Sequence, residues 1–265
     1  MSLRLAVLGD IHGNLAALEA ALADIKRHKP DRIAVTGDHV FHGSRPAEVV
    51  ERLQALQKDG ALVVAGNTDI AVADNDYTAA FPWMEQAPSA YTAAAEWARE
   101  QLSDDQLDWL RGLPNERRIW EGDLLTLVCH ASPGSITAGL PADLDPPTTV
   151  ERVTRTDARV ICCGHTHIAD TRELGRKLIV NPGSCGYSFD GDPAAAWALL
   201  TIPDAVAGAS DSDDNEEEPM DMAMPEATLL RAKYDWNEAA EEVAARGLPG
   251  DVYRAATMRA GRLIR

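Results

Sequence analysis

Six short apolar runs, each about the length of a β-strand, constrain the fold of this chain more than any other feature. They cover residues 3–10, 32–38, 61–67, 124–130, 159–165 and 178–183. Several lack strict alternation of apolar and polar residues, which is typical of strands covered on both faces. Five of the runs finish on a potential metal ligand, and these are Asp10, Asp38, Asn67, His130 and His165. Since open α/β sheets bind ligands beyond the carboxyl ends of their strands, we expect these side chains to converge.

Helical patterns separate the first three runs. The first helix is predicted to begin with Asn14 as its N-cap, and the second has Pro46 near its first position and ends at Gly60. This β-α-β-α-β order predicts a parallel sheet with right-handed crossovers. A chain of 265 residues with 45% apolar content can form one large domain or two small ones, and we expect a single domain over residues 1–265.

Residues 71–115 interrupt this order and are predicted to form a helical cap packed beside the sheet. Within the segment, Ser103 and Gln106 fit a capping box, and Gly112 fits the end of a helix. Further along the chain, we expect two strands around AAAWALLTI and ATLLRAKY, and then one terminal helix that begins at Asp235.

The net charge of −17 is unevenly distributed. Residues 204–226 hold nine acidic side chains and no Lys or Arg, so the rest of the chain carries −8. This balance argues against an extended basic surface for nucleic acid, but it is compatible with a small phosphate ester. With no aromatic and few apolar residues, the segment is predicted to be a disordered loop. A protein partner that binds the loop is the alternative to a solvated insertion.

The cysteines and the lengths of the apolar stretches bear on the compartment. Cys129, Cys162, Cys163 and Cys185 lie in or just after apolar runs without the paired spacing of zinc ligands, so we expect buried, reduced thiols. No apolar stretch has the length of a membrane span, and the first run is too short for a signal peptide. We therefore expect a cytoplasmic protein with no membrane partner.

Two of the strand ends carry a second candidate ligand two positions further on. His12 follows Asp10 and His167 follows His165, and in extended backbone such pairs point the same way. Taken singly, each motif has an ordinary explanation, because Gly-Asn-Thr-Asp and Gly-Asp fit turns and a lone His fits a hydrogen-bonded imidazole. The combination of all seven residues at strand ends favours a metal site.

These motifs resemble those of the calcineurin-like metallophosphoesterases. The family pattern is Asp-x-His, Gly-Asp, Gly-Asn-His-Asp/Glu, a single His and Gly-His-x-His, and this chain has GDIH, TGDH, GNTD, VCHASP and GHTH. VNPGSCG, AAAEWAREQL and KYDW are similar to a compact bacterial and archaeal branch, so the resemblance covers residues 1–203 and about 227–265. It implies an α/β fold in which two mixed β-sheets flanked by helices form a four-layer αββα sandwich.

The resemblance also implies two metal ions and assigns their ligands. One metal is held by Asp10, His12 and His167, the other by Asn67, His130 and His165, and Asp38 bridges them. Mixed oxygen and imidazole ligands favour divalent transition metals, with Mn²⁺ ahead of Fe or Zn²⁺, over Ca²⁺ or Mg²⁺. A neutral amide ligand at Asn67 would preserve Lewis acidity that a third carboxylate would cancel.

The expected reaction is hydrolysis of a phosphate ester by attack of a metal-bridging hydroxide. Asp38, Asn67 and His130 are the ligands that we expect to take part most directly. Asp69 is expected to orient its neighbours or cap the next segment, and residues 181–184 are expected to form a turn, which the resemblance places beside the site.

Thr68 departs from the family pattern, because many members have His at this position. That His is usually assigned to leaving-group protonation or phosphate contact, and a threonine hydroxyl is too weak an acid to replace it. We therefore expect phosphodiesters or activated esters to be favoured, or a nearby His39 or His42 to serve. The alternative is that both are exposed loop imidazoles.

Two further functions are compatible with the same residues. One is a nucleotide or protein phosphomonoesterase. The other is a metal-binding scaffold with little catalysis, because the retromer scaffold subunit shares the implied fold and Thr68 replaces the usual His.

Overall fold

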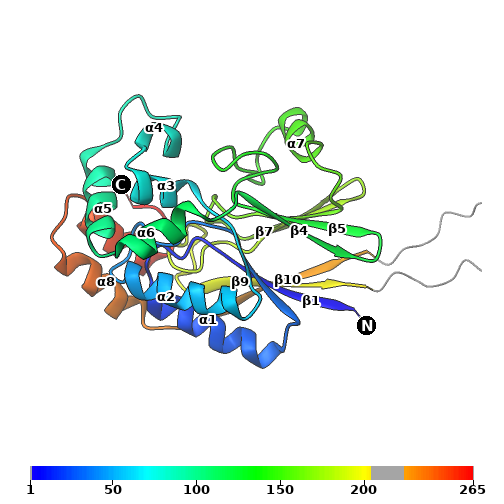
Figure 1. Cartoon of the computed structure of the whole chain (residues 1–265), viewed down its shortest axis with the longest axis horizontal. Coiled ribbons are helices and arrows are strands. Elements are labelled where there is room, and N and C mark those ends of the chain that lie inside the picture. The colour runs from blue at the N-terminus through cyan, green and yellow to red at the C-terminus, as the bar shows by residue number, and fades with distance from the viewer. Residues whose placement is uncertain (1, 204–223, 265) are drawn as a thin grey trace, which may run out of the picture.

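The computed structural model describes residues 2–203 and 224–264, and over these it shows two β-sheets stacked face to face with helices on both outer sides (Figure 1). Each sheet has five strands. The predicted αββα sandwich is therefore confirmed. The predicted acidic loop, 204–226, falls almost wholly outside the described residues. Within the described ranges, no helix combines the length and the apolar character that crossing a membrane requires.

The first sheet contains the strands predicted from the first three apolar runs, in the order β10-β9-β1-β2-β3. Its members are β1 (Leu3–Leu8), β2 (Arg32–Val35), β3 (Leu62–Val63), β9 (Ala195–Ile202) and β10 (Glu226–Ala232). The pairs β1–β2 and β2–β3 are parallel, as expected. The later strands β9 and β10, which were also predicted, add in antiparallel fashion and make the sheet mixed.

The second sheet has the order β4-β5-β6-β8-β7. Its members are β4 (Glu116–Glu121), β5 (Leu124–Cys129), β6 (Val160–Cys162), β7 (Asp170–Leu174) and β8 (Lys177–Asn181). The inner strands β5, β6 and β8 are parallel, and the two edge strands are antiparallel. The sequence did not predict β4 or β7, because edge strands carry charged side chains instead of an apolar run.

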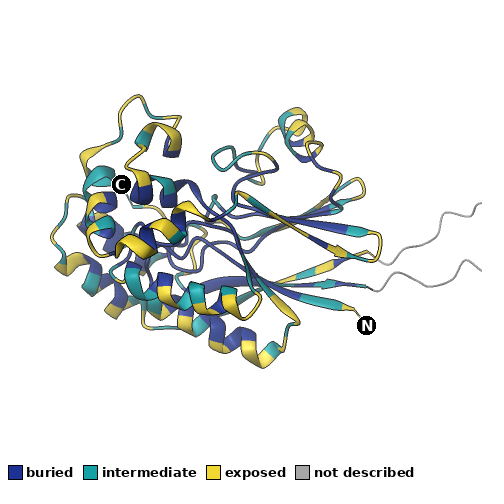
Figure 2. Ribbon diagram, viewed as in Figure 1, coloured by how far each residue is buried: buried dark blue, intermediate teal, exposed yellow. Residues whose placement is uncertain are grey.

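Apolar side chains fill the space between the two sheets. Val7 and Ala34 of the first sheet and Val128 and Val160 of the second are fully buried there. The next residue along β1, Leu8, packs on the opposite face under the helices. Figure 2 shows the consequence, with buried strands at the centre and exposed residues on the outer faces of the helices. Burial on both faces explains why the strand sequences lack alternation.

Nine helices surround the sheets in the described residues. They are α1 (Leu15–His28), α2 (Pro46–Lys58), α3 (Asn67–Asp74), α4 (Tyr77–Ala80), α5 (Ser89–Glu100), α6 (Asp104–Arg111), α7 (Pro146–Val153), α8 (Trp236–Ala245) and α9 (Asp251–Ala260). The N-cap at Asn14, Pro46 at the start of α2 and the capping box of Ser103 with Gln106 are confirmed. The terminal helix predicted to begin at Asp235 is confirmed as α8, but it is not the last, since a further helix, α9, follows and pairs with it (Figure 1).

The strands end before the residues that were predicted to finish them. β1 stops at Leu8, β2 at Val35 and β6 at Cys162, while β3 covers only two residues. Asn67 lies at the start of α3 and not at a strand tip. Loops and a helix terminus therefore present the candidate ligands, because several of these residues adopt backbone angles that a strand cannot contain.

Candidate metal centre

The seven predicted ligands come together at the carboxyl ends of the parallel strands. The first sheet and α3 supply Asp10, His12, Asp38 and Asn67, and the second sheet supplies His130, His165 and His167. Side-chain contacts of 3.6 Å or less connect all seven. Six of them are buried, and only His165 is half-buried. The convergence expected from the sequence is thus present, with each sheet contributing part of the cluster.

The backbone of the cluster is left-handed at five of these seven residues. Their φ angles lie between 51° and 71°, and the residues are Asp10, His12, Asp38, His165 and His167. This conformation costs a non-glycine residue roughly 1–2 kcal/mol, and it concentrates at functional sites. The prediction that each Asp-x-His or His-x-His pair lies in extended backbone is therefore wrong. Tight turns after the strands aim these side chains inward.

The first ligand group consists of Asp10, His12, His167 and Asp38. One potential ligand atom from each residue lies within 4.8 Å of the others, and all four residues are buried. The Nε2 atoms of His12 and His167 are 3.0 Å apart. His12 Nε2 lies 3.6 Å from Asp38 Oδ2, and His167 Nε2 lies 3.5 Å from Asp10 Oδ1. Two carboxylates and two imidazoles thus face one point.

The second ligand group consists of Asn67, His130, His165 and Asp38. Asn67 Oδ1 lies 2.9 Å from His130 Nε2 and 3.0 Å from His165 Nδ1. The two imidazole nitrogens are 3.2 Å apart, and His130 Nε2 lies 3.4 Å from Asp38 Oδ1. The two oxygens of Asp38 therefore face different groups, Oδ2 the first and Oδ1 the second. This arrangement matches the bridging role that the family resemblance implies.

Outer hydrogen bonds turn lone pairs of His130 and Asn67 into the second group. His130 Nδ1 donates to the carbonyl of Thr36 at 2.7 Å, so the Nε2 atom of the neutral ring carries a lone pair. Asn67 Nδ2 donates to the carbonyl of Ala80 at 3.0 Å, which turns its Oδ1 toward His130. Two acceptors at 2.9 Å repel each other unless a cation lies between them. Ligands about 2.0–2.2 Å from one cation lie roughly 3.0–3.6 Å apart, so this group fits a bound metal ion.

The first group is oriented in a similar way. His167 Nδ1 donates to the carbonyl of Tyr187 at 2.5 Å, which leaves its Nε2 lone pair facing His12. The loop that carries Tyr187 follows the predicted turn at residues 181–184, where Gly183 has a φ of 80°. Ser184 Oγ donates to the carbonyl of Asp10 at 2.7 Å. The turn therefore lies beside the cluster, as expected, and supports two of its loops.

Asp69 orients its neighbours, as the sequence predicts. Its carboxylate accepts hydrogen bonds from the backbone amides of Gly66 at 2.9 Å, Asp38 at 3.1 Å and His39 at 2.8 Å. These bonds fix the loop that carries Asp38 against the start of α3. Burial, with the nearby charge of Asp69, raises the pKa of Asp38 to about 7 in the metal-free protein, and the backbone amide of Thr68 opposes this shift.

The imidazoles of the cluster are neutral at pH 7 and so are available as ligands. Burial lowers the pKa of His130 and His165 to about 4 and that of His167 to about 3. Burial also lowers the pKa of His12, and it raises the pKa of Asp10 well above its ordinary value. The raised pKa values show that ionising these two buried carboxyl groups is costly, and a divalent cation would offset that cost.

The residues considered for leaving-group protonation lie close to the cluster. Thr68 is buried, and its amide donates to Asp38 Oδ1 at 2.9 Å, while its hydroxyl oxygen has no partner among the described residues. His39 is fully buried with its Nε2 3.0 Å from the carbonyl of Val64, so the exposed-loop alternative is wrong for it. His42 is half-buried, and its ring centroid lies 4.7 Å from that of His12.

Several aromatic residues that the sequence analysis did not single out surround the cluster. Phe189 stacks on His167 with ring centroids 4.3 Å apart, and Tyr187 packs against His42 at 4.3 Å. Trp83 lies 5.9 Å from His165 in an edge-on arrangement. No motif or spacing marks these residues, because the loops that carry them meet the ligands only in the folded chain. The four cysteines are free and buried, as predicted.

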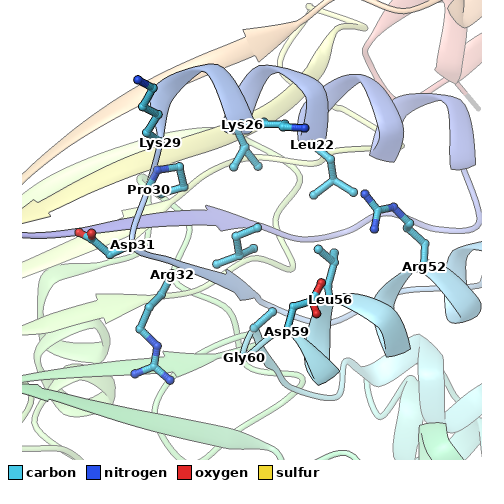
Figure 3. Close-up of a pocket in the computed structure, with 13 residues that line it drawn as sticks. Leu22, Lys26, Lys29, Pro30, Asp31, Arg32, Arg52, Leu56, Asp59 and Gly60 are labelled. Atoms are coloured by element: carbon cyan, nitrogen blue, oxygen red, sulfur yellow. The ribbon is translucent and has the colours of Figure 1, made fainter.

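A hollow of about 530 Å³ lies elsewhere, between the end of α1, the end of α2 and the start of β2 (Figure 3). Its lining includes Leu22 and Leu56 together with both cationic and anionic side chains, among them Arg32 and Asp59. Because Arg32 begins β2 and Asp38 follows its end, the hollow is at the amino ends of the strands. It contains none of the predicted site residues.

The fold and the cluster together define a metal-binding α/β protein whose ligands come from two facing mixed sheets. A family model described as the calcineurin-like phosphoesterase superfamily domain matches residues 3–205. The chain therefore belongs to the calcineurin-like phosphoesterase superfamily. Membership supports a hydrolase activity, the family uses divalent metals, and the cluster is a possible site for them, while the substrate is left open.

Individual proteins resemble this chain over most of its length. The crystal structure of a metallophosphoesterase from Sphaerobacter thermophilus is 25% identical, with a TM-score of 0.70 over 98% of this chain and 100% of that chain. A hypothetical protein from Pyrococcus horikoshii OT3 shares the fold at 20% identity, with a TM-score of 0.73 over 94% and 96% of the two chains. An uncharacterized protein from Methanocaldococcus jannaschii is 27% identical over 264 residues, 92% of this chain and 93% of its own length.

Proposed function

We propose that this protein is a dinuclear metal-dependent phosphoesterase that favours phosphodiesters or activated esters. The observation that carries the proposal is the division of the cluster into two groups of potential ligand atoms joined by the two oxygens of Asp38. A structural polar network would place a donor between each pair of acceptors. Here the outer hydrogen bonds of His130, Asn67 and His167 place their donors on the outside, which is the arrangement of ligands around cations.

The two ligand groups would hold two divalent ions of the Mn²⁺, Fe or Zn²⁺ type, because imidazole, carboxylate and amide ligands suit these metals. When bound, such ions supply Lewis acidity toward phosphoryl oxygens and lower the pKa of water. The chain keeps its ligands rigid through Asp69, the carbonyl of Thr36 and the carbonyl of Tyr187. Burial keeps the imidazoles neutral, so they do not have to lose a proton at pH 7.

The preference for diesters or activated esters rests on Thr68. Its amide binds Asp38 and its hydroxyl is no proton donor at neutral pH, so this position does not supply a general acid. His39 fits that role poorly, since it is fully buried and its Nε2 faces the carbonyl of Val64. An ester whose leaving group departs as a stable anion needs no proton from the protein.

A nucleotide or protein phosphomonoesterase is the alternative activity of the same centre. A metal-binding scaffold with little catalysis is the alternative from a different class, and the unusual Thr68 is the observation that favours it. Relative rates on phosphodiesters and phosphomonoesters distinguish the proposed activity from a phosphomonoesterase. Any turnover at all distinguishes an enzyme from a scaffold.

The deciding experiment measures metal content and then hydrolysis. The purified protein is analysed for metal and then assayed with bis-p-nitrophenyl phosphate and p-nitrophenyl phosphate in the presence of added Mn²⁺. We expect close to two metal ions per chain and faster turnover of the diester. The variant Asp59→Asn, which removes an exposed carboxylate far from the cluster, is assayed alongside as a control and should match the native protein in both measurements. Absence of both bound metal and turnover with every metal tested would refute the proposal.

A further inference from the structure

The cluster opens to solvent at one ligand. Of the seven candidate ligands, only His165 is half-buried, and the other six are buried. A cleft of about 600 Å³ is lined by Thr137, which lies in the loop after β5, and by Ala79, the residue next to Ala80, whose carbonyl accepts a hydrogen bond from Asn67. A substrate that reaches the cluster therefore passes the His165 side, between the loop after β5 and the segment around α4.

Trp83 stands at this opening. It lies in the loop between α4 and α5, which runs along the top of Figure 1. Its indole is 54% exposed, although its neighbour Phe81 is buried. The ring meets Phe81 at 5.9 Å and the ring of His165 at 5.9 Å, the latter at an interplanar angle of 70°. A large aromatic side chain left exposed against a candidate metal ligand marks a contact surface for a ligand.

Two more half-buried rings lie close to the cluster. Phe189, which is half-buried, stacks on His167, and the half-buried ring of His42 packs beside His12. Among the described residues, no Lys or Arg forms a hydrogen bond or ion pair with any of the seven candidate ligands. Two cations in the cluster would then balance a phosphate group, and the surroundings would contact an apolar substituent.

We propose that Trp83 stacks on an aromatic ring of the substrate, so that the centre selects phosphodiesters with an aryl or nucleobase group next to the phosphate. This inference rests on the proposed phosphoesterase function and adds the substrate class. A phosphodiester with an aromatic substituent offers Trp83 a ring to stack on, which a small aliphatic ester does not. The indole supplies a broad face for stacking, which tolerates different ring systems.

The test compares matched ligands on the Mn²⁺-loaded protein by isothermal titration calorimetry. The monomethyl esters of phenylphosphonate and methylphosphonate carry the same singly charged group, as a phosphodiester does, and differ in the ring. The methyl esters of adenosine 5′-monophosphate and ribose 5-phosphate form a second pair that separates a nucleobase from a simple aryl group. We expect the native protein to bind the aromatic member of at least one pair roughly tenfold more tightly.

Trp83→Ala is expected to reduce that ratio to near one, with metal content unchanged, and Trp83→Phe is expected to keep most of it. Trp120→Ala is the matched control, because Trp120 is 63% exposed on β4 and pairs with Leu125 near the start of β5, away from the cluster. It should leave the ratio as in the native protein.

Equal affinity for the aromatic and aliphatic members of both pairs, or an unchanged ratio in Trp83→Ala, would overturn the inference while leaving the phosphoesterase function intact. Failure of the native protein to bind any of the four ligands would overturn it as well. Loss of the proposed function has a different signature, namely no bound metal and no hydrolysis of any ester.

Discussion

The two ligand groups share Asp38 but differ in charge and in access. The first group has two carboxylates and two imidazoles, and all four residues are buried. The second replaces one carboxylate with the amide of Asn67 and includes the half-buried His165. With Asp38 counted in both, the ligand charge is −2 in the first group and −1 in the second. The first group is therefore suited to holding a cation, and the second to presenting one to a substrate.

The groups also differ in how the backbone supports them. Asp10, His12 and His167 of the first group all have positive φ, while Asn67 begins a helix in the second. Backbone bonds hold the strained loops, since the amides of Asp10 and His12 donate at 3.0 Å to the carbonyls of Gly37 and Asp38. The buried, highly charged group is thus the one with the most strained backbone, and its rigidity comes from neighbouring loops.

The most direct test of the comparison between the two ligand groups is to replace Asp38, the residue that they share. Asp38→Asn takes the shared charge from both, so we expect both metals to bind weakly and hydrolysis to fall by much more than the roughly 10- to 100-fold that loss of an outer partner costs. Asp69→Asn tests that smaller effect, because Asp69 only orients the loop. Metal analysis and hydrolysis of bis-p-nitrophenyl phosphate measure both variants, and similar losses would contradict a bridging role.

A second change tests whether the second ligand group lacks a general acid. Thr68→His restores an imidazole beside Asn67, and a general acid there is expected to raise the rate for esters with poor leaving groups by about 10² or more. The rate for p-nitrophenyl esters should change little. A series of aryl esters in the native protein gives the complementary measurement. Rates independent of leaving-group pKa, with the chemical step limiting, would remove the argument from Thr68.

Metal removal should empty the two ligand groups one after the other. Because the second group has the smaller ligand charge and the more exposed His165, we expect graded chelation to remove its ion first, with affinities that differ by about tenfold or more. Metal content and activity are measured at each chelator concentration. Activity that disappears while about one ion per chain remains would support the comparison, and simultaneous loss of both ions would contradict it.

The pH dependence of metal binding is the smallest expected effect when it is counted for each unit of pH. In the metal-free protein the pKa of Asp38 is raised to about 7, so below pH 7 a cation must displace its proton, and the affinity should fall by about tenfold for each unit of pH. The raised pKa of Asp10 acts in the same direction. His130 and His165, with pKa values lowered to about 4, add nothing between pH 5 and 7. Calorimetry at several pH values measures the slope, and an affinity that is constant over this range would contradict it.

Local rules predicted much of the fold. The cap at Asn14 and the box of Ser103 with Gln106 depend on residues a few positions apart, so the sequence alone is sufficient to identify them. Edge strand β4, with Arg117 and Arg118 exposed, has no apolar run to detect. Helix α9 was missed because part of its buried face is an ion pair between Asp251 and Arg254 and not an apolar stripe.

The order and chemical types of the seven ligands, and hence the expectation of a metal centre, were determined by the sequence itself. Only the tertiary structure decided how they divide, because the division depends on left-handed turns and on carbonyls such as that of Thr36, which lies 94 positions from His130. The same is true of Trp83, whose position over His165 joins segments 82 residues apart in the chain. Contacts between distant segments leave no local periodicity, so their effect on the site is visible only once the two sheets are packed together.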